Sequence, residues 1–295
     1  MIIIRNLRKI YRSKEKTVEA LKGVDLTVNQ GDFIAVCGRS GAGKSTLLHI
    51  IGCLDGDFEG EYTFLGENIK TLSESKKAKL RNRAIGFVLQ EYGLINDESV
   101  LENVMLPLRF GRRSSEREKK ERARAALEKV GIADLAKSRA DEISGGQRQR
   151  AAIARALVTE PNLLLADEPT GALDAKTAAE LMALFRTLNE EGMTIIVVTH
   201  DDAVAAACSR TLRLEAGLWV KSAPYFYILK FLSLKKPFQN DRIGFQRRLF
   251  SLPFCRYEKR PNNSFGLLVL KTNRGNKKRK IPKKSLGKIS EVDLG

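Results

Sequence analysis

A glycine-rich segment carries the residues best suited to chemistry. It reads Gly38-Arg39-Ser40-Gly41-Ala42-Gly43-Lys44-Ser45, followed by Thr46. The spacing fits the pattern G-x-x-x-x-G-K-S/T, in which glycines let backbone N–H groups curl around a phosphate. We predict that Lys44 reaches the terminal phosphates of a nucleotide and that the Ser45 hydroxyl ligates Mg²⁺. The alternative is a glycine-rich turn without a ligand.

Two carboxylates follow a second apolar run. The run Asn162–Asp167 ends in Asp167, and Glu168 comes next. We expect Asp167 to bind Mg²⁺, directly or through water, and Glu168 to orient and polarise an attacking water. By itself, such a pair is typical of a plain strand end. The phosphate-binding loop favours the functional interpretation.

Alternating strands and helices must position these groups. Three apolar runs predict strands, at Asp32–Gly38, Asn162–Asp167 and Thr194–Thr199, because runs rich in Leu, Ile and Val are typical of strands buried on both faces. Helices are predicted at Lys44–Cys53 and Ala175–Glu190. Strands that alternate with helices indicate an α/β fold with a largely parallel sheet.

A helical insert is predicted over roughly residues 96–147. Ser115 and Glu118 have the spacing of a capping box. Apolar residues then recur at helical spacing, at Ala123, Ala126, Leu127 and Val130.

Composition excludes several classes of protein. The 295 residues are 43% hydrophobic and 29% charged, and no apolar run reaches the roughly 20 residues of a membrane-spanning helix. The four cysteines show no paired spacing, which fits a reducing compartment and argues against a disulfide framework or a zinc site. The net charge of +17 is uneven, because residues 221–295 hold a surplus of +15. This asymmetry predicts a boundary near residue 220.

Further motifs identify a family. A signature segment, Ile143-Ser144-Gly145-Gly146-Gln147, precedes RQRAAIARAL; Gln90 ends AIGFVLQ, Asp174 ends Ala-Leu-Asp, and His200 follows TIIVVT. With the loop and the carboxylates, these segments resemble the ATP-binding cassette (ABC) subunits of transporters over about residues 1–220. The resemblance implies the P-loop NTPase ABC fold, with a RecA-like core sheet, an N-terminal antiparallel β part and a helical signature subdomain.

The resemblance also implies roles. Two cassettes close head to tail around two ATP molecules, so that Ser144, Gly145, Gly146 and Gln147 of one chain cap the ATP held by the other chain's phosphate loop. Gln90 senses Mg²⁺ and the attacking water, and His200 holds the γ-phosphate. Asp174 communicates across the dimer, and Tyr11 stacks on adenine, with surface packing as the alternative for that side chain.

A subgroup is implied as well. The segments GKSTLLHIIGCLDGDFEGEYTFLGENI, IGFVLQEYGLIN, ENVMLPL and PTGALD look like the cassettes of lipoprotein-release, macrolide-export and antimicrobial-peptide-resistance systems. Such cassettes are cytoplasmic, lie on the cytoplasmic face of the cell membrane and drive a separately encoded integral-membrane permease. We therefore expect a motor subunit that hydrolyses ATP.

The basic tail, residues 221–295, leaves alternatives open. It holds 10 of the chain's 20 aromatic residues, and no helical or strand period runs through it. It could dock on anionic lipid, bind nucleic acid, or be an appendage without a function, such as an out-of-frame extension. We favour the appendage without a function, and of the two binding interpretations we favour anionic lipid over nucleic acid. The alternative function is accordingly a soluble ABC ATPase that acts on ribosomes or nucleic acid through this tail.

Overall fold

The computed structural model describes residues 1–13, 16–111, 114–220, 255–258 and 267–270. The chain divides into two compact units, Met1–Lys221 and Ser222–Gly295. In the second unit, β11 (Cys255–Glu258) pairs antiparallel with β12 (Leu267–Leu270). The sequence shows no clean strand period at these two segments, and the interpretations of the tail's function concern residues that lie mostly outside the described ones.

The first unit is built on a six-stranded sheet with the order β10-β9-β3-β8-β7-β6. Five neighbouring strands are parallel, and only β10 runs antiparallel to β9. The strands are β3 (Phe33–Cys37), β6 (Ile85–Val88), β7 (Leu163–Asp167), β8 (Thr194–Thr199), β9 (Arg210–Glu215) and β10 (Leu218–Val220). Since parallel strands end at the same edge, the loops after β3, β6, β7 and β8 gather there.

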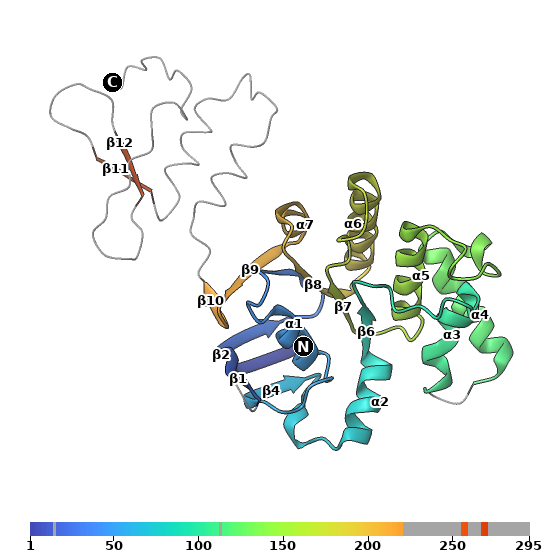
Figure 1. Ribbon diagram of the computed structural model, residues 1–295, viewed down its shortest axis with the longest axis horizontal. Coiled ribbons are helices and arrows are strands. Elements are labelled where there is room, and N and C mark those ends of the chain that lie inside the picture. Colours follow the sequence, from blue (N-terminus) through green and yellow to red (C-terminus); the bar gives the residue numbers. More distant parts are fainter. Residues whose placement is uncertain (14–15, 112–113, 221–254, 259–266, 271–295) are drawn as a thin grey trace, which may run out of the picture. The chain divides into compact units, whose positions relative to one another are not determined.

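A second, antiparallel sheet has the order β2-β1-β4-β5. Its strands are β1 (Ile2–Arg12), β2 (Thr17–Val28), β4 (Glu59–Phe64) and β5 (Glu67–Asn68). It lies beside helix α1 in Figure 1. The described residues thus form the α/β fold with an N-terminal antiparallel part that the sequence predicts.

The helices lie in two groups around the central sheet (Figure 1). The helices that follow strands are α1 (Lys44–Ile51), α2 (Glu74–Ala84), α6 (Ala175–Glu190) and α7 (Asp202–Ala207). Between β6 and β7 the chain forms α3 (Val100–Arg109), α4 (Glu116–Lys129) and α5 (Gly145–Leu157). Short 3₁₀ turns occur at Ile69–Thr71 and Ala133–Leu135. None of the helices in the described part is long and apolar enough to cross a membrane.

The central strands feed two apolar cores, one on each face of the sheet. In β3, Phe33 and Ala35 pack with the helices of the 100–157 segment, α6 and α7, whereas Ile34 and Val36 pack with α1 and the antiparallel sheet. All five residues of β3 are buried. This burial on both faces explains why the strand is an unbroken apolar run rather than an alternating one.

Most predicted elements are confirmed within a residue or two. Helix α6 and strand β8 have the predicted bounds, and α1 ends at Ile51 rather than Cys53. The capping box predicted at Ser115 is only half formed: the Ser115 hydroxyl accepts from the Glu118 N–H at 3.2 Å, without the return bond. The complete box stands at Ser144 instead.

Candidate functional site

The phosphate loop follows β3 at the shared strand edge. A Cβ on Gly38 would lie 2.2 Å from the carbonyl oxygen of Leu214, and one on Gly43 would lie 2.4 Å from that of Ala20. Gly43 also has φ +101, a conformation that L side chains rarely adopt. The loop therefore approaches neighbouring backbone closely at both ends, and these positions accept only glycine.

Helix α1 begins directly after this loop with its N-terminus open. Gly43 is the N-cap residue, so no side chain caps the helix, and the first turn holds no acidic residue. Backbone N–H groups at such an end, together with the helix dipole, favour an anion. Lys44 is buried, with 8% of its surface exposed, and its Nζ donates to the carbonyl oxygens of Gly38 at 2.9 Å and Arg39 at 3.2 Å. Its charge therefore lies within the loop, where a phosphate would bind.

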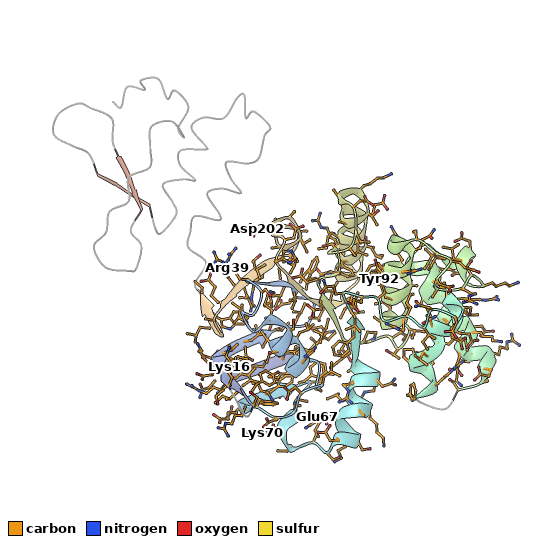
Figure 2. The ribbon with its side chains drawn as sticks, in the orientation of Figure 1. Lys16, Arg39, Glu67, Lys70, Tyr92 and Asp202 are labelled. Carbon is orange, nitrogen blue, oxygen red and sulfur yellow. The ribbon has the colours of Figure 1, made fainter. Side chains whose placement is uncertain are left out.

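The remaining predicted loop residues differ in exposure. Arg39 (labelled in Figure 2), Ser40, Gly41 and Ser45 are exposed, Thr46 is half-buried and Ala42 is buried. The rim of the loop is thus open to a ligand from solvent.

Glu168 and His200 meet at the ends of β7 and β8. These strands are parallel neighbours, with Asp167 opposite Val198. Glu168 Oε1 lies 2.8 Å from His200 Nδ1, and the His200 backbone N–H donates to Oε2 at 3.4 Å. Glu168 has φ 45, uncommon for a residue with a side chain. Only 12% of the Glu168 side chain is exposed, against 72% for His200. The carboxylate is therefore oriented and shielded, while the imidazole faces solvent.

Asp167, the last residue of β7, lies at the same edge. Burial raises the pKa of Asp167 above its ordinary value, and the charge of Glu168 adds to this effect, whereas Lys44 and a hydrogen bond with Ser45 oppose it. Asp167 and Ser45 therefore sit together and offer a carboxylate and a hydroxyl, the oxygen donors that Mg²⁺ prefers. The residues fit this cation, although the described part holds no cluster of three or more His, Cys, Asp or Glu side chains. A nucleotide site supplies further oxygens from the phosphates.

Gln90 lies near the carboxylate pair. It follows β6 and is exposed. A Cβ on Gly171 would lie 3.9 Å from Gln90 Nε2 and 3.8 Å from Glu168 Cβ. Four predicted residues, Gln90, Asp167, Glu168 and His200, are thus brought to one edge of the sheet together with the phosphate loop.

The signature residues lie elsewhere in the unit. Ser144 is the N-cap of α5: its Oγ accepts from the Gln147 N–H at 3.4 Å, and Gln147 Oε1 accepts from the Ser144 N–H at 2.8 Å. A Cβ on Gly146 would lie 2.7 Å from Thr177 Cγ2, which places the start of α5 against the start of α6. Gly145 precedes it in the same turn. Among the described residues, no hydrogen bond or ion pair joins this turn to the phosphate loop.

Asp174 caps α6 beside the signature. Its carboxylate accepts from the N–H groups of Lys176 and Thr177 and from the Thr177 hydroxyl at 2.7 Å. These hydrogen bonds lower the pKa of Asp174. The structure therefore brings Asp174 and the signature together, apart from the residues at the strand ends.

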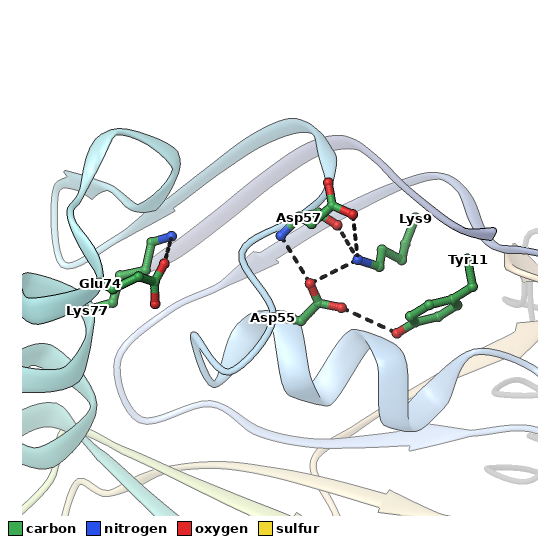
Figure 3. Close-up of polar contacts among 6 residues, drawn as sticks. All are labelled: Lys9, Tyr11, Asp55, Asp57, Glu74 and Lys77. Atoms are coloured by element: carbon green, nitrogen blue, oxygen red, sulfur yellow. Dashed lines mark hydrogen bonds and ion pairs between the residues drawn. The ribbon is translucent and has the colours of Figure 1, made fainter. Parts of the chain in front are cut away.

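Tyr11 lies on β1 of the antiparallel sheet. The side chain is partly exposed, at 43%, and its hydroxyl donates to Asp55 Oδ2 at 3.3 Å. Lys9 Nζ lies 4.9 Å from the ring centroid. Figure 3 shows the ring beside Lys9 and Asp55, above helix α1.

Two contacts at the edge of the site were missed by the sequence. The first is the burial of Lys9 between Asp55 and Asp57, for which the only signal is that Lys9 shares an inward face with buried Leu7. The second is Arg155 near the end of α5, which donates to the backbone oxygens of Tyr92 and Gly93 just after Gln90. Tyr92 is labelled in Figure 2. No sequence pattern signals this second contact.

The open helix end, the buried lysine and the carboxylates on one parallel-strand edge define a nucleoside-triphosphatase site of the P-loop class. Comparisons with known proteins identify the family within this class. The family model "ABC transporter" matches residues 21–171. The chain belongs to this family and is an ABC ATPase.

Individual relatives agree with that placement. The chain is 46% identical over 217 residues to an uncharacterized ABC transporter ATP-binding protein, YknY of Bacillus subtilis, covering 74% of this chain and 94% of the relative. It is 46% identical over 220 residues to the macrolide export ATP-binding/permease protein MacB of Syntrophobacter fumaroxidans, and there the match spans 31% of the relative. A solved structure, the dimeric post-hydrolysis state of the ATP-binding cassette MJ0796 bound to ADP and Pi, matches with a TM-score of 0.70 and 42% identity, covering 75% of this chain and 97% of that one.

Proposed function

We propose that this chain is the ATP-hydrolysing motor subunit of a transporter and drives a separately encoded membrane permease. The observation that carries the proposal is the uncapped N-terminus of α1, with buried Lys44 beside it and the carboxylates of Asp167 and Glu168 on the same strand edge. Membership of the ABC transporter family supports the use of ATP.

Four residues act on the transferred phosphoryl group. Lys44 stabilises its charge, which is the main catalytic contribution in phosphoryl transfer. Glu168 orients and polarises the attacking water, and the contact with His200 at 2.8 Å keeps its carboxylate aimed at the strand edge. His200 holds the γ-phosphate, because 72% of its side chain stays exposed to a ligand while Nδ1 contacts Glu168. Gln90, beside Glu168, senses the water and the metal.

The nucleotide contacts extend over three segments. Tyr11 stacks on the base, and the phosphates bind the loop residues Gly38, Arg39, Ser40, Gly41, Ala42, Gly43, Lys44, Ser45 and Thr46. Ser45, Asp167 and Gln90 are the candidates to hold Mg²⁺, which when bound neutralises charge on the β- and γ-phosphates. The proximity of Ser45 to Asp167 supports this donor set.

The second half of the site comes from another copy of the chain. Ser144, Gly145, Gly146, Gln147 and Asp174 form a polar surface that makes no hydrogen bond to the phosphate loop of its own chain, among the residues described. An ATP-dependent homodimer gives this surface a partner. The dimeric state of the MJ0796 cassette supports the arrangement.

The transporter is of the export or lipoprotein-release and peptide-resistance type. The similarity to the macrolide export protein MacB and to YknY supports this subgroup. In this proposal the chain, residues 1–220 of which form the cassette with a helical subdomain at about 96–147, lies in the cytoplasm on the membrane face that carries the permease. The alternative of a ribosome- or nucleic-acid-directed ATPase is not favoured by these relatives.

The proposal is tested by the Mg²⁺-dependent ATPase activity of Lys44→Met, with Lys77→Met as the matched control. Both lysines are buried, at 8% and 6%, but Lys77 pairs with Glu74 on α2, away from the loop. We expect kcat/KM to fall by about 100-fold or more for Lys44→Met and to stay unchanged for Lys77→Met. Equal activity of Lys44→Met and wild type contradicts the assignment.

A further inference from the structure

Lys9 is a buried cation with a complete set of partners. Only 5% of its side chain is exposed. Its Nζ lies 2.9 Å from Asp55 Oδ1, 3.2 Å from Asp57 Oδ2 and 2.5 Å from the Asp57 carbonyl oxygen (Figure 3). An ammonium has three donors, so these acceptors fix it in one place. Burial by itself lowers the pKa of Lys9, but the two aspartates outweigh that effect and raise it.

The same group of residues holds the ring of Tyr11. Lys9 Nζ lies over the ring, 4.9 Å from its centroid, at a distance suited to a cation–π contact. The Tyr11 hydroxyl donates to the other oxygen of Asp55. The ring is thus fixed at its face and at its hydroxyl, although 43% of the residue faces solvent.

The position of this ring is tied to the phosphate loop. On strand β2, Val18 is opposite Tyr11 and Leu21 is opposite Lys9. Leu21 Cδ2 would lie 3.1 Å from a Cβ on Gly43, so β2 borders the phosphate loop directly. Because β1, which carries Tyr11, is paired with β2, the ring is connected through β2 to the phosphate loop.

We propose that Lys9, held by Asp55 and Asp57, is a positioning residue for the nucleotide base. It fixes the Tyr11 ring as a platform before the base arrives, so that binding does not have to order an exposed side chain. This inference rests on the proposed function, because it takes ATP as the ligand of the phosphate loop. It assigns the lysine and the two aspartates to recognition of the base and not of the phosphates.

The experiment compares two ligands on Lys9→Met. ATP carries a base, whereas inorganic tripolyphosphate with Mg²⁺ carries only the phosphates. We expect the Kd for ATP to rise about tenfold, as for the loss of a cation–π contact and a stacking platform, and the Kd for tripolyphosphate to stay unchanged. Lys9→Arg should recover part of the ATP affinity. Lys77→Met, which removes the other buried lysine in Figure 3, should alter neither Kd.

A double-mutant cycle tests the link to the ring. Tyr11→Ala should raise the Kd for ATP by a similar factor, and adding Lys9→Met to Tyr11→Ala should have no further effect. Asp55→Asn, which keeps the shape of the side chain, serves if Lys9→Met does not fold. Equal losses for ATP and tripolyphosphate, additive effects in the cycle or no loss at all overturn the inference. If wild type binds neither ligand, the proposed function itself fails.

Discussion

Two helix N-termini of this cassette differ in whether a side chain caps their free backbone N–H groups. The N-cap residue of helix α1 is Gly43, which has no side chain to accept hydrogen bonds from the first backbone N–H groups of the helix. The N-cap residue of helix α5 is Ser144, whose hydroxyl forms a reciprocal capping box with the Gln147 side-chain amide. The box serves the N–H groups of Ser144 and Gln147 and leaves those of Gly145 and Gly146 unused among the described contacts.

The difference shows how the two ends are suited to different partners. The open end of α1 has a buried lysine and carboxylates beside it, all supplied by its own chain. The end of α5 keeps its shape without a ligand, and still offers a hydroxyl proton and two backbone donors. The first end suits phosphates bound within one chain, and in the proposed dimer the second end faces a phosphate held by another copy.

The largest effect is expected from removing the carboxylate near the α1 end. Glu168→Gln should lower kcat for ATP hydrolysis by about 100-fold or more, because the amide cannot accept a proton from water, while ATP affinity is retained. Glu160→Gln is the control. Glu160 has a left-handed backbone like Glu168, with φ 54, but its side chain is exposed. Steady-state ATPase assays with equilibrium ATP binding check this. An active Glu168→Gln enzyme contradicts the role.

The glycine at the open helix end should have the next largest effect. Gly43→Ala places a Cβ 2.4 Å from the Ala20 carbonyl oxygen at φ +101 and should lower the free energy of unfolding by about 3 kcal/mol. Gly192→Ala has a similar φ of +98 but meets nothing within 4 Å, so about 1 kcal/mol is expected. Urea denaturation of both variants measures the difference. Equal losses show that the close approach of the loop to β2 is unimportant.

Substitutions at two serine N-caps test the capped end of α5. Ser144→Ala and Ser99→Ala each remove a hydroxyl that accepts from the third residue of its helix, at 3.4 Å and 3.1 Å. Both should lose about 1 kcal/mol of unfolding free energy. Only Ser144→Ala should weaken ATP-dependent dimerisation, followed by light scattering. Equal weakening by Ser99→Ala would show that the cap of α5 has no specific role in dimerisation.

The smallest effect concerns three buried thiols. Burial raises the pKa of Cys37 and Cys53 to about 11 and that of Cys208 to about 12. An unfolded thiol ionises near 9.0, so the stabilising contribution of the neutral thiols is full below that pH and is lost as the pH rises through about 11. We expect no alkylation of Cys37, Cys53 and Cys208 in the folded protein at pH 8, measured by peptide mass spectrometry. Rapid labelling of Cys37 indicates that β3 opens next to the loop.

The sequence predicts the α1 end far better than its surroundings. Loop, strand and helix are consecutive in the chain, so spacing alone orders Gly38, Lys44 and Ser45. The pairing of Glu168 with His200 joins residues 32 positions apart and depends on strand order, and the left-handed φ of Glu168 leaves no composition signal. The site of Lys9 depends on a strand, a helix end and a loop up to 48 positions away. Side-chain networks of this kind are set by tertiary packing, which periodicity does not describe.

In the proposed dimer, the α5 end of one copy completes the α1 end of another. We would measure the mass of full-length Glu168→Gln by gel filtration with light scattering, with and without Mg²⁺ and ATP. We expect a monomer without ATP and a dimer with it, and loss of the dimer in Glu168→Gln combined with Ser144→Arg. A protein that binds ATP yet stays monomeric, both at full length and as residues 1–220, would contradict it.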